Sequence, residues 1–381
     1  MTTSSWNRVE IDLGALRYNL TQIKTLVGAE VEIMAVVKSD AYGHGLVSAA
    51  RAFSEAGAGI FGVAEVEEGV RLREAGIAGK IVVLLGVGRQ GVADAVAYDL
   101  SPVVYDLETI RALSVQAAKA GHDIGVHLKI DVGMGRLGIM PHELDGFLEV
   151  LAGLPYIHLA GFLSHLPKAD VRDDNSTQAC RAVFAEFIER LDRASLRGHV
   201  AHIANSAALM RMPAARFDMV RPGISLYGCS PADWLPGNCG VKLRPALSFK
   251  SSVIQLKEVP AGFGVSYGHR FITERPTRLA VLPVGYADGY LRRLARKAEV
   301  LVAGRRAPIR GMICMNACMA DVTDLPEVVV GDEVVLLGRQ GEAEITADEI
   351  AEWSQTINYE ILCLLGAANR QVYIDSDASQ A

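Results

Sequence analysis

The sequence predicts an N-terminal (β/α)8 barrel over residues 1–235 and a C-terminal β-rich domain over residues 236–381. Three observations support this prediction. Eight short runs rich in valine and isoleucine alternate with amphipathic stretches up to about residue 228, as in a barrel of parallel strands. A segment with the composition of a linker follows at residues 234–240. Beyond it, alternating apolar residues are punctuated by glycine and proline at short intervals, which is typical of a β-rich domain.

The barrel strands are expected to be buried on both faces, because helices cover a parallel sheet from outside. The outer helices include residues 107–120 and 177–194, and a further helix at residues 13–27 precedes the first unit. A doubly wound sheet is the alternative, but the first turn lacks the G-x-G-x-x-G that would favour it. The eight expected strands are residues 33–38, 60–65, 81–86, 101–105, 124–131, 157–164, 199–205 and 219–226.

The second domain is expected to contain one helix at residues 346–356, with Thr346 as its N-cap and Glu349 three residues on. Its expected strands are residues 246–259, 278–284, 299–302, 307–315 and 333–337.

Composition narrows the class of protein. Of 381 residues, 50% are hydrophobic and the net charge is −6, which argues against a partner as acidic as a nucleic acid. The apolar run at residues 81–88 is one of the longest, whereas a membrane helix needs about 20 residues. No secretory signal opens the chain, and none of the six cysteines forms a C-x-x-C pair. We therefore expect a cytoplasmic protein with free thiols.

Chemically active side chains follow the expected barrel strands, where barrel enzymes place their active sites. His165 and His202 lack carboxylate or cysteine companions at the spacing of metal ligands, so no metal site is predicted. The residues at the strand ends are Lys38, Lys129, Asp131, Ser164, His165, Asn205, Ser206 and Arg221.

Lys38 ends the apolar run Ile-Met-Ala-Val-Val-Lys. A charged amine is costly to bury there, and a Schiff base would remove that cost while using the amine chemically. The alternative is a lysine that reaches solvent at the strand end.

Residues 37–45, Val-Lys-Ser-Asp-Ala-Tyr-Gly-His-Gly, resemble the pyridoxal-phosphate lysine motif of alanine racemases. Further blocks resemble this family in the same order along both domains, and one of them, residues 129–138, is similar to its carboxylate-binding loop. The other blocks are residues 9–13 with Asn19, 161–165, 202–206, 221–228, 264–268, 285–289, 314–315 and 357–360.

The resemblance implies an isomerase that interconverts L- and D-alanine by a two-base mechanism through a pyridoxal phosphate aldimine, supplying D-alanine for peptidoglycan. Lys38 would serve one face of the α-carbon and Tyr267 the other. Free tyrosine titrates near 10, so a tyrosinate at neutral pH needs its pKa lowered by about three units. The family's hydrogen-bond chain would here run Tyr267–His165–Arg221.

The resemblance also assigns the remaining site residues. Arg221 would face the cofactor ring nitrogen, and His202 would either pack behind the cofactor or bond Arg221. Arg136 and the backbone of Met315 would hold the substrate carboxylate. Lys129 aligns with a lysine that is carbamylated in some members. The phosphate would be held by Tyr42, Ser206, Gly223, Ile224 and Tyr359. Lys129, Tyr286 and Asn316 would be supporting residues of the site.

The chain departs from the family pattern at two points, which leaves the substrate preference open. Asn316-Ala317 stands where the family commonly has Asp-Gln, and Val132 replaces a threonine. A broader-specificity or serine racemase is therefore the first alternative. A non-catalytic pyridoxal-phosphate-binding protein is another, but the second domain with Tyr267 and Met315 argues against it. A related decarboxylase shares the architecture but should not require the pattern of Tyr267 and Arg136. The resemblance further implies a head-to-tail homodimer, in which each β-rich domain covers the partner's barrel.

Overall fold

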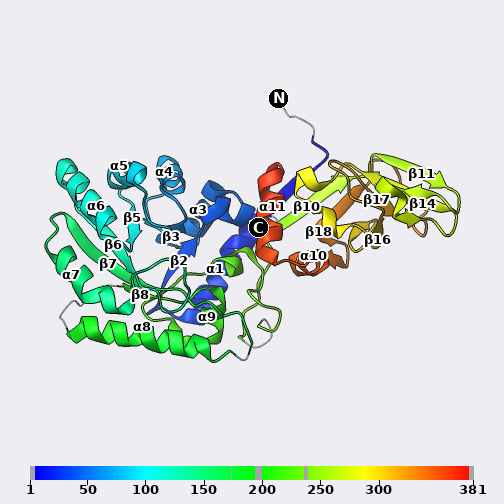
Figure 1. The fold of residues 1–381 in the computed structure, drawn as a ribbon. Coiled ribbons are helices and arrows are strands. Elements are labelled where there is room, and N and C mark those ends of the chain that lie inside the picture. The colour runs from blue at the N-terminus through cyan, green and yellow to red at the C-terminus, as the bar shows by residue number, and fades with distance from the viewer. Residues whose placement is uncertain (1–4, 173, 194–199, 236–238, 377–381) are drawn as a thin grey trace. The chain divides into compact units, whose positions relative to one another are not determined.

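The chain, described here by a computed structural model, divides into two compact units (Figure 1). Residues 5–172, 174–193, 200–235 and 239–376 are described. The barrel unit comprises Leu16–Ala41 and Leu46–Leu243, and the β-rich unit comprises Met1–Ala15, Tyr42–Gly45 and Arg244–Ala381. Two segments before the predicted boundary near residue 235, the first 15 residues and Tyr42–Gly45, group with the β-rich unit. The first segment contains β1 (Arg8–Asp12), which pairs with β10 (Leu247–Ser252) and β20 (Gln371–Ile374) of the β-rich sheet. In the second segment, Gly43 O accepts from Gln371 Nε2 at 3.0 Å.

The barrel unit contains eight parallel strands, one overlapping each expected run, in the order β8-β7-β6-β5-β4-β3-β2-β9. The expected run 219–226 is a strand only at Met219–Val220, and its end lies in a 3-10 helix at Ile224–Tyr227. Hydrogen bonds from Asp218 N to Ala201 O (3.2 Å) and from Arg221 N to Ala204 O (2.9 Å) join β9 to β8. This sequential order confirms the barrel and excludes the doubly wound alternative. The strands are β2 (Glu32–Val36), β3 (Ile60–Val63), β4 (Lys80–Val83), β5 (Ser101–Val104), β6 (Ile124–Lys129), β7 (Ile157–Leu163), β8 (Val200–His202) and β9 (Met219–Val220).

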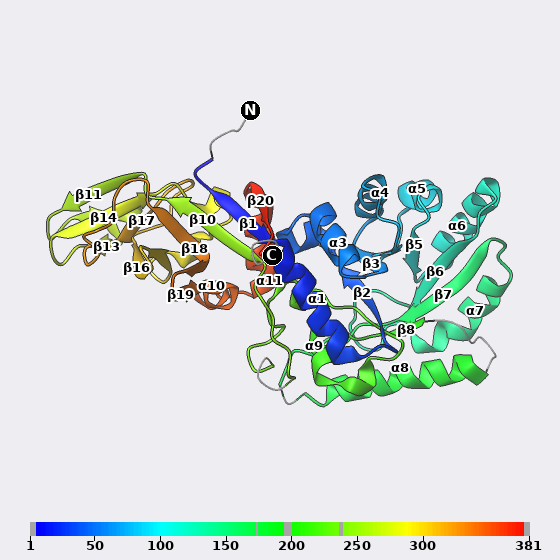
Figure 2. The same cartoon turned by 180° about the vertical axis from the view of Figure 1, so that it is seen from behind.

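Helices surround the barrel strands, as both views show (Figures 1 and 2). The expected helix at 107–120 is α6, where the Asp106 carboxylate caps Thr109 N (2.7 Å) and Gly121 ends the helix at φ +64°. The expected helix at 177–194 is α8, except that residue 194 lies outside the described residues. The helices are α1 (Leu13–Val27), α2 (Lys38–Gly43), α3 (Leu46–Glu55), α4 (Val66–Glu74), α5 (Val92–Ala97), α6 (Leu107–Ala120), α7 (Leu144–Ala152), α8 (Ser176–Arg193) and α9 (Ser206–Arg211).

The β-rich unit is built on one large sheet in the order β11-β14-β17-β16-β15-β18-β10-β1-β20, with β19 paired to β18 and β12 to β13. Its strands are β10 (Leu247–Ser252), β11 (Gln255–Val259), β12 (Gly264–Val265), β13 (Phe271–Ile272), β14 (Thr277–Leu282), β15 (Glu299–Val302), β16 (Arg305–Arg310), β17 (Cys318–Asp321), β18 (Glu333–Gln340), β19 (Ala343–Ile345) and β20 (Gln371–Ile374).

Two expected strands of this unit differ from the structure. The run 246–259 is two strands, because its first part pairs with β18 and its second with β14. The run 307–315 ends as β16 at Arg310, where Gly311 turns the chain at φ +73°. The helix α10 (Ala347–Ser354) confirms the N-cap, since Thr346 Oγ1 accepts from Glu349 N at 3.1 Å. A second helix, α11 (Asn358–Ala368), was not expected.

Separate apolar cores hold the two units. In the barrel unit, side chains from different strands meet in a cluster of Met34, Val82, Val103, Leu163 and Met219. Burying each such side chain stabilises the fold by about 1.5–3 kcal/mol. All six cysteines are free, as expected. Within the described residues, no helix is long and apolar enough to cross a membrane.

Candidate active site

Lys38 stands at the carboxyl end of β2, half-buried, and the chain after it makes a left-handed turn. Residues Ser39–Tyr42 have φ between +51° and +56°, a conformation that costs a non-glycine residue about 1–2 kcal/mol. Gly43 continues at φ +84°, and a Cβ there would lie 2.5 Å from the carbonyl oxygen of Leu362. Such strain persists only where surrounding contacts hold it, so the backbone behind Lys38 is tightly determined.

Arg221 is buried at the carboxyl end of β9 and its guanidinium is held by backbone carbonyls. Nη2 donates to Ser164 O (2.7 Å) and Ile203 O (3.2 Å), while Nη1 donates to His202 O (2.7 Å). Nη1 also bonds His202 Nδ1 at 3.0 Å, so the structure shows His202 bonding Arg221. Burial, with the charge of Arg136, lowers the pKa of Arg221 to about 10. The guanidinium therefore stays a fixed cation at neutral pH.

His202 is bonded in turn to a second buried histidine, His127, with 3.0 Å between His202 Nε2 and His127 Nδ1. Arginine can only donate, so His202 Nδ1 accepts from Arg221 and its proton lies on Nε2, which donates to His127. Burial lowers the pKa of His127 to about 3 and that of His202 well below its usual value. Both rings are therefore neutral. The sequence analysis missed His127, although it lies two residues before Lys129 and shares that face of β6.

Positive charge is concentrated around these residues. Burial is the main cause that lowers the pKa of Lys129 to about 8 and that of His165 to about 3, and Arg221, Arg136 and Lys38 lower both further. Such a cluster of cations favours an anionic ligand. No hydrogen bond between His165 and Arg221 is observed in the described structure; their interaction is electrostatic.

Hydroxyl and N–H groups gather where β8 and β9 end. Ser206 begins α9, which Asn205 caps by accepting from Ala208 N (3.0 Å). Gly223 N donates to Ser206 Oγ (2.9 Å), and Ser206 Oγ lies 3.0 Å from Ser225 Oγ. Of the two hydroxyl protons, one makes that bond, which leaves one to donate to an anion. Ile224 follows as the first residue of a short helical turn.

Arg136 lies on a loop whose backbone is organised by Asp131. The Asp131 carboxylate accepts from Gly133 N and Met134 N (both 2.8 Å) and from Arg136 N (3.2 Å). The side chain of Arg136 is exposed. The loop therefore presents a guanidinium to solvent on a constrained backbone.

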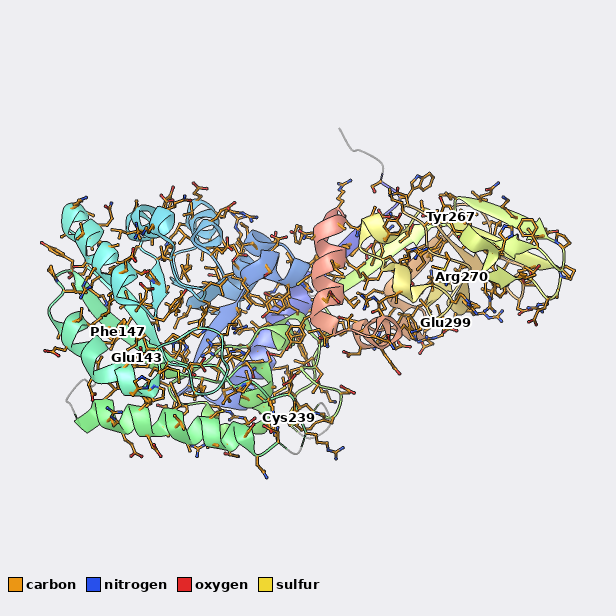
Figure 3. All side chains as sticks on the ribbon, in the orientation of Figure 1. Glu143, Phe147, Cys239, Tyr267, Arg270 and Glu299 are labelled. Carbon is orange, nitrogen blue, oxygen red and sulfur yellow. The ribbon has the colours of Figure 1, made fainter. Side chains whose placement is uncertain are left out.

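The other predicted site residues belong to the β-rich unit. The rings of Tyr42 and Tyr359 lie 6.0 Å apart at 45°, and burial raises the pKa of Tyr42, which keeps its hydroxyl protonated. Tyr267 lies on a short turn and is 71% exposed (Figure 3). Met315 is 56% and Tyr286 43% exposed.

One loop pair brings Tyr286 and Met315 together. Tyr286 N donates to Cys314 O (3.1 Å), and Ala287 N donates to Met315 O (3.0 Å). A Cβ on Gly285 would lie 2.2 Å from both carbonyl oxygens, so only glycine permits this approach. Asn316, also exposed, follows in the same loop.

The comparisons with known proteins decide the family. The alanine racemase N-terminal domain matches residues 11–231, and the alanine racemase C-terminal domain matches residues 246–373. The chain belongs to the alanine racemase family. Alanine racemases of Halothermothrix orenii and Syntrophobacter fumaroxidans are each 45% identical to it, over 363 and 362 residues and 95% of each chain.

Solved alanine racemases share the fold. The enzyme from D-cycloserine-producing Streptomyces lavendulae has a TM-score of 0.92 at 36% identity, covering 98% of both chains. The Bacillus anthracis enzyme with bound L-Ala-P has a TM-score of 0.91 at 37% identity, covering 99% of this chain and 97% of that one. Alanine racemases are pyridoxal-phosphate-dependent isomerases.

The donor set of this alanine racemase family member fits that cofactor. A lysine, a buried permanent cation and a hydroxyl beside backbone N–H groups all stand at the carboxyl ends of barrel strands, within a cluster of positive charge. No group of three or more histidine, cysteine, aspartate or glutamate side chains in the described part of the chain is arranged to hold a metal ion.

Proposed function

We propose that this chain is an alanine racemase that interconverts L- and D-alanine with pyridoxal phosphate bound at Lys38. The observation that carries the proposal is Lys38, set on a left-handed turn at the end of β2 in a unit whose buried Arg221 is fixed by three carbonyls. Supply of D-alanine for peptidoglycan, in the cytoplasm, is the role that fits the family.

The cofactor would be held by residues of the barrel unit, together with Tyr42 and Tyr359 of the β-rich unit. Lys38 would hold it covalently, and Arg221 would face its ring nitrogen, where a permanent cation disfavours a second positive charge. When bound, pyridoxal phosphate supplies the electron sink that stabilises negative charge at the substrate α-carbon. The phosphate would be held by Tyr42, Ser206, Gly223, Ile224 and Tyr359.

Proton transfer would need two groups on opposite faces of the α-carbon. Lys38 Nζ would take or give the proton on one face, and the Tyr267 hydroxyl on the other. His165, kept neutral by burial and the surrounding cations, would bond the Tyr267 oxygen, and Arg221 would act on His165 through its charge rather than through a hydrogen bond. Arg136 would bind the substrate carboxylate as a fork, with the backbone N–H of Met315 beside it.

We further propose a head-to-tail homodimer with shared sites. The barrel unit carries Lys38 and Arg136, whereas Tyr267, Tyr286 and Met315 lie exposed on the β-rich unit. Exposed side chains that gather on one unit mark a surface that another protein covers. Two-fold symmetry would then complete two identical sites, each using one barrel and the partner's β-rich unit.

A racemase assay on alanine, serine and lysine, with bound cofactor quantified, tests this function. We expect alanine to be racemised by protein that carries one pyridoxal phosphate per chain. Borohydride reduction and peptide mapping should place the cofactor on Lys38. Higher turnover of serine would favour the serine racemase, for which the exposed Asn316 is the specific observation. Cofactor binding without racemisation of any amino acid would contradict the proposal.

A further inference from the structure

Helix α4 holds the turn that follows Lys38 through a single carboxylate. Glu68 Oε1 accepts a hydrogen bond from Ser39 N at 2.6 Å, 29 residues away along the chain. Its other oxygen, Oε2, accepts from Ala64 N at 2.7 Å and from Glu65 N at 3.4 Å, directly after β3. One side chain therefore ties the end of β3 to the residue next to Lys38.

A second contact from the same helix holds the next residue of the turn. Arg71, one turn after Glu68 on α4, lies 3.7 Å from Asp40 Oδ1. The same oxygen of Asp40 accepts from Leu46 N at 2.9 Å, at the start of α3. The first two left-handed residues after Lys38 thus each contact a charged side chain of α4.

The left-handed turn explains why such contacts are needed. Ser39 and Asp40 have φ of +55° and +51°, and neither is the glycine that adopts this region freely. Contacts from outside the turn therefore help to hold Ser39 at positive φ, and its bond to Glu68 is one of them. A hydrogen bond from its N–H to a carboxylate is charge-assisted and stronger than one to a neutral acceptor.

We propose that Glu68 is a positioning residue for Lys38: its carboxylate fixes the Ser39 N–H and so sets where the Lys38 amine stands. This inference rests on the proposed role of Lys38. Glu68 would touch neither cofactor nor substrate; it acts through the backbone of the strained turn. A misplacement of about 1 Å in a reacting group can cost about 100-fold in rate.

Glu68 also has an ordinary structural role, which the test must separate. Its Oε2 forms a capping box at the N-terminus of α4, with Glu65 as the N-cap residue. Glutamine serves at this capping position as glutamate does. Glu68→Gln can therefore keep the cap through its one carbonyl oxygen, while its NH2 group faces the Ser39 N–H and cannot accept from it.

The experiment compares Glu68→Gln with Glu67→Gln in the cofactor-loaded protein. Glu67 is an exposed carboxylate in the same first turn of α4. Glu67→Gln therefore removes the same negative charge as Glu68→Gln. We expect both variants to melt within a few degrees of wild type. In Glu68→Gln alone, Ser39 amide exchange should accelerate at least about 10-fold and kcat should fall about 10- to 100-fold, with KM changed less than about 3-fold. The pH midpoint of the Lys38-bound cofactor's visible absorption should also shift in Glu68→Gln alone.

Several outcomes would overturn the proposal. One is a Glu68→Gln protein whose Ser39 exchange and kcat match those of Glu67→Gln; another is an equal loss in both variants. If Glu68→Gln does not fold, Glu68→Asp replaces it, because it keeps the charge but is too short to span Ser39 and Ala64. Ser39 exchange does not depend on turnover, so it reports on Glu68 even if wild type racemises nothing and the proposed function fails.

Discussion

Several predicted site residues of the barrel unit are buried, whereas those on two loops of the β-rich unit are exposed. Arg221 and Lys129 are each 6% exposed and His202 is fully buried. In the β-rich unit, Tyr267 is 71% and Met315 is 56% exposed. The barrel unit therefore fixes these three side chains in its interior, whereas the β-rich unit presents Tyr267 and Met315 at its surface. Arg136, on a loop of the barrel unit, is exposed as well.

This difference separates two ways of organising a site. Arg221 is fixed before any ligand binds, because three backbone carbonyls and His202 accept from it. The backbone of the 285–289 and 314–317 loops is equally ordered by its own hydrogen bonds. The side chains of Tyr286 and Met315 on these loops are exposed to solvent. We therefore expect a second subunit to cover them in the proposed homodimer.

The largest expected contrast is in stability. Arg221→Ala would remove the donor to the buried carbonyls of Ser164 and Ile203, whereas His202 O would keep its bond from Ser164 N (3.3 Å). The free energy of unfolding should fall by about 3 kcal/mol. Tyr267→Ala removes an exposed side chain and should cost less than about 1 kcal/mol. Denaturant unfolding of both variants measures the contrast. Equal losses would show that the two sets of residues are held alike.

Acid should destabilise the barrel unit through its buried histidines. The pKa of His127 is about 3 in the folded chain against a usual value of 6.5, so below pH 6.5 the unfolded chain binds a proton that the folded chain does not. Stability is therefore lost as the pH falls from 6.5 toward 3, by about 2 kcal/mol between pH 7 and pH 5 for one such group.

The matched variant for this acid effect is His127→Gln. Its unfolding free energy should fall less than that of wild type between pH 7 and pH 5, by about 2 kcal/mol. An identical fall in both proteins would mean that His127 is protonated as readily in the folded chain as in the unfolded one.

A substitution at Asn316 tests the exposed site residues of the β-rich unit. Restoring the family's carboxylate with Asn316→Asp places an anion beside Met315. The ratio of kcat/KM for alanine to that for serine should then change by about 5- to 30-fold, which corresponds to a coupling of about 1–2 kcal/mol between neighbouring groups. Its stability should not change, because the side chain is exposed. A ratio equal to that of wild type would show that this departure is neutral.

A smaller effect on activity is expected from the reaction of carbon dioxide with the Lys129 amine. With a pKa of about 8, about a tenth of this amine is neutral and nucleophilic at pH 7. We predict that it is carbamylated, which would place a negative charge beside Arg136. Bicarbonate should raise the activity of carbon-dioxide-depleted protein by a few fold, and mass spectrometry after trapping should find the adduct on Lys129. Activity that does not respond, with an unmodified amine, would refute this.

The sequence predicted the elements whose signal is local. Each barrel strand is a compact apolar run, and the cap of α10 needs only Thr346 and Glu349, three residues apart. Strand β1 was assigned to the barrel because its partners, β10 and β20, lie more than 230 residues further along the chain. Pairing over such a separation leaves no local pattern to read.

The same reason explains the residues that the sequence analysis missed at the site. His127 is hydrogen-bonded to His202, 75 residues away along the chain, and Glu68 to Ser39, 29 residues away. Neither belongs to a motif that indicates its partner. The left-handed turn was equally hidden, because Ser39-Asp40-Ala41-Tyr42 contains no glycine that would signal positive φ. The predicted roles of Tyr267, Arg136 and Met315 depend on the resemblance and stay predictions.

Mixing two inactive variants tests most directly whether the barrel of one subunit works with the β-rich unit of another. Lys38→Ala and Tyr267→Ala should each lose at least about 100- to 10,000-fold in activity. If they are refolded together, half of the randomly formed dimers carry one copy of each, with both lesions in one site and the other intact. About a quarter of wild-type activity should then return, with dimers confirmed by size in every sample. Complete subunit exchange without recovered activity would contradict the shared site.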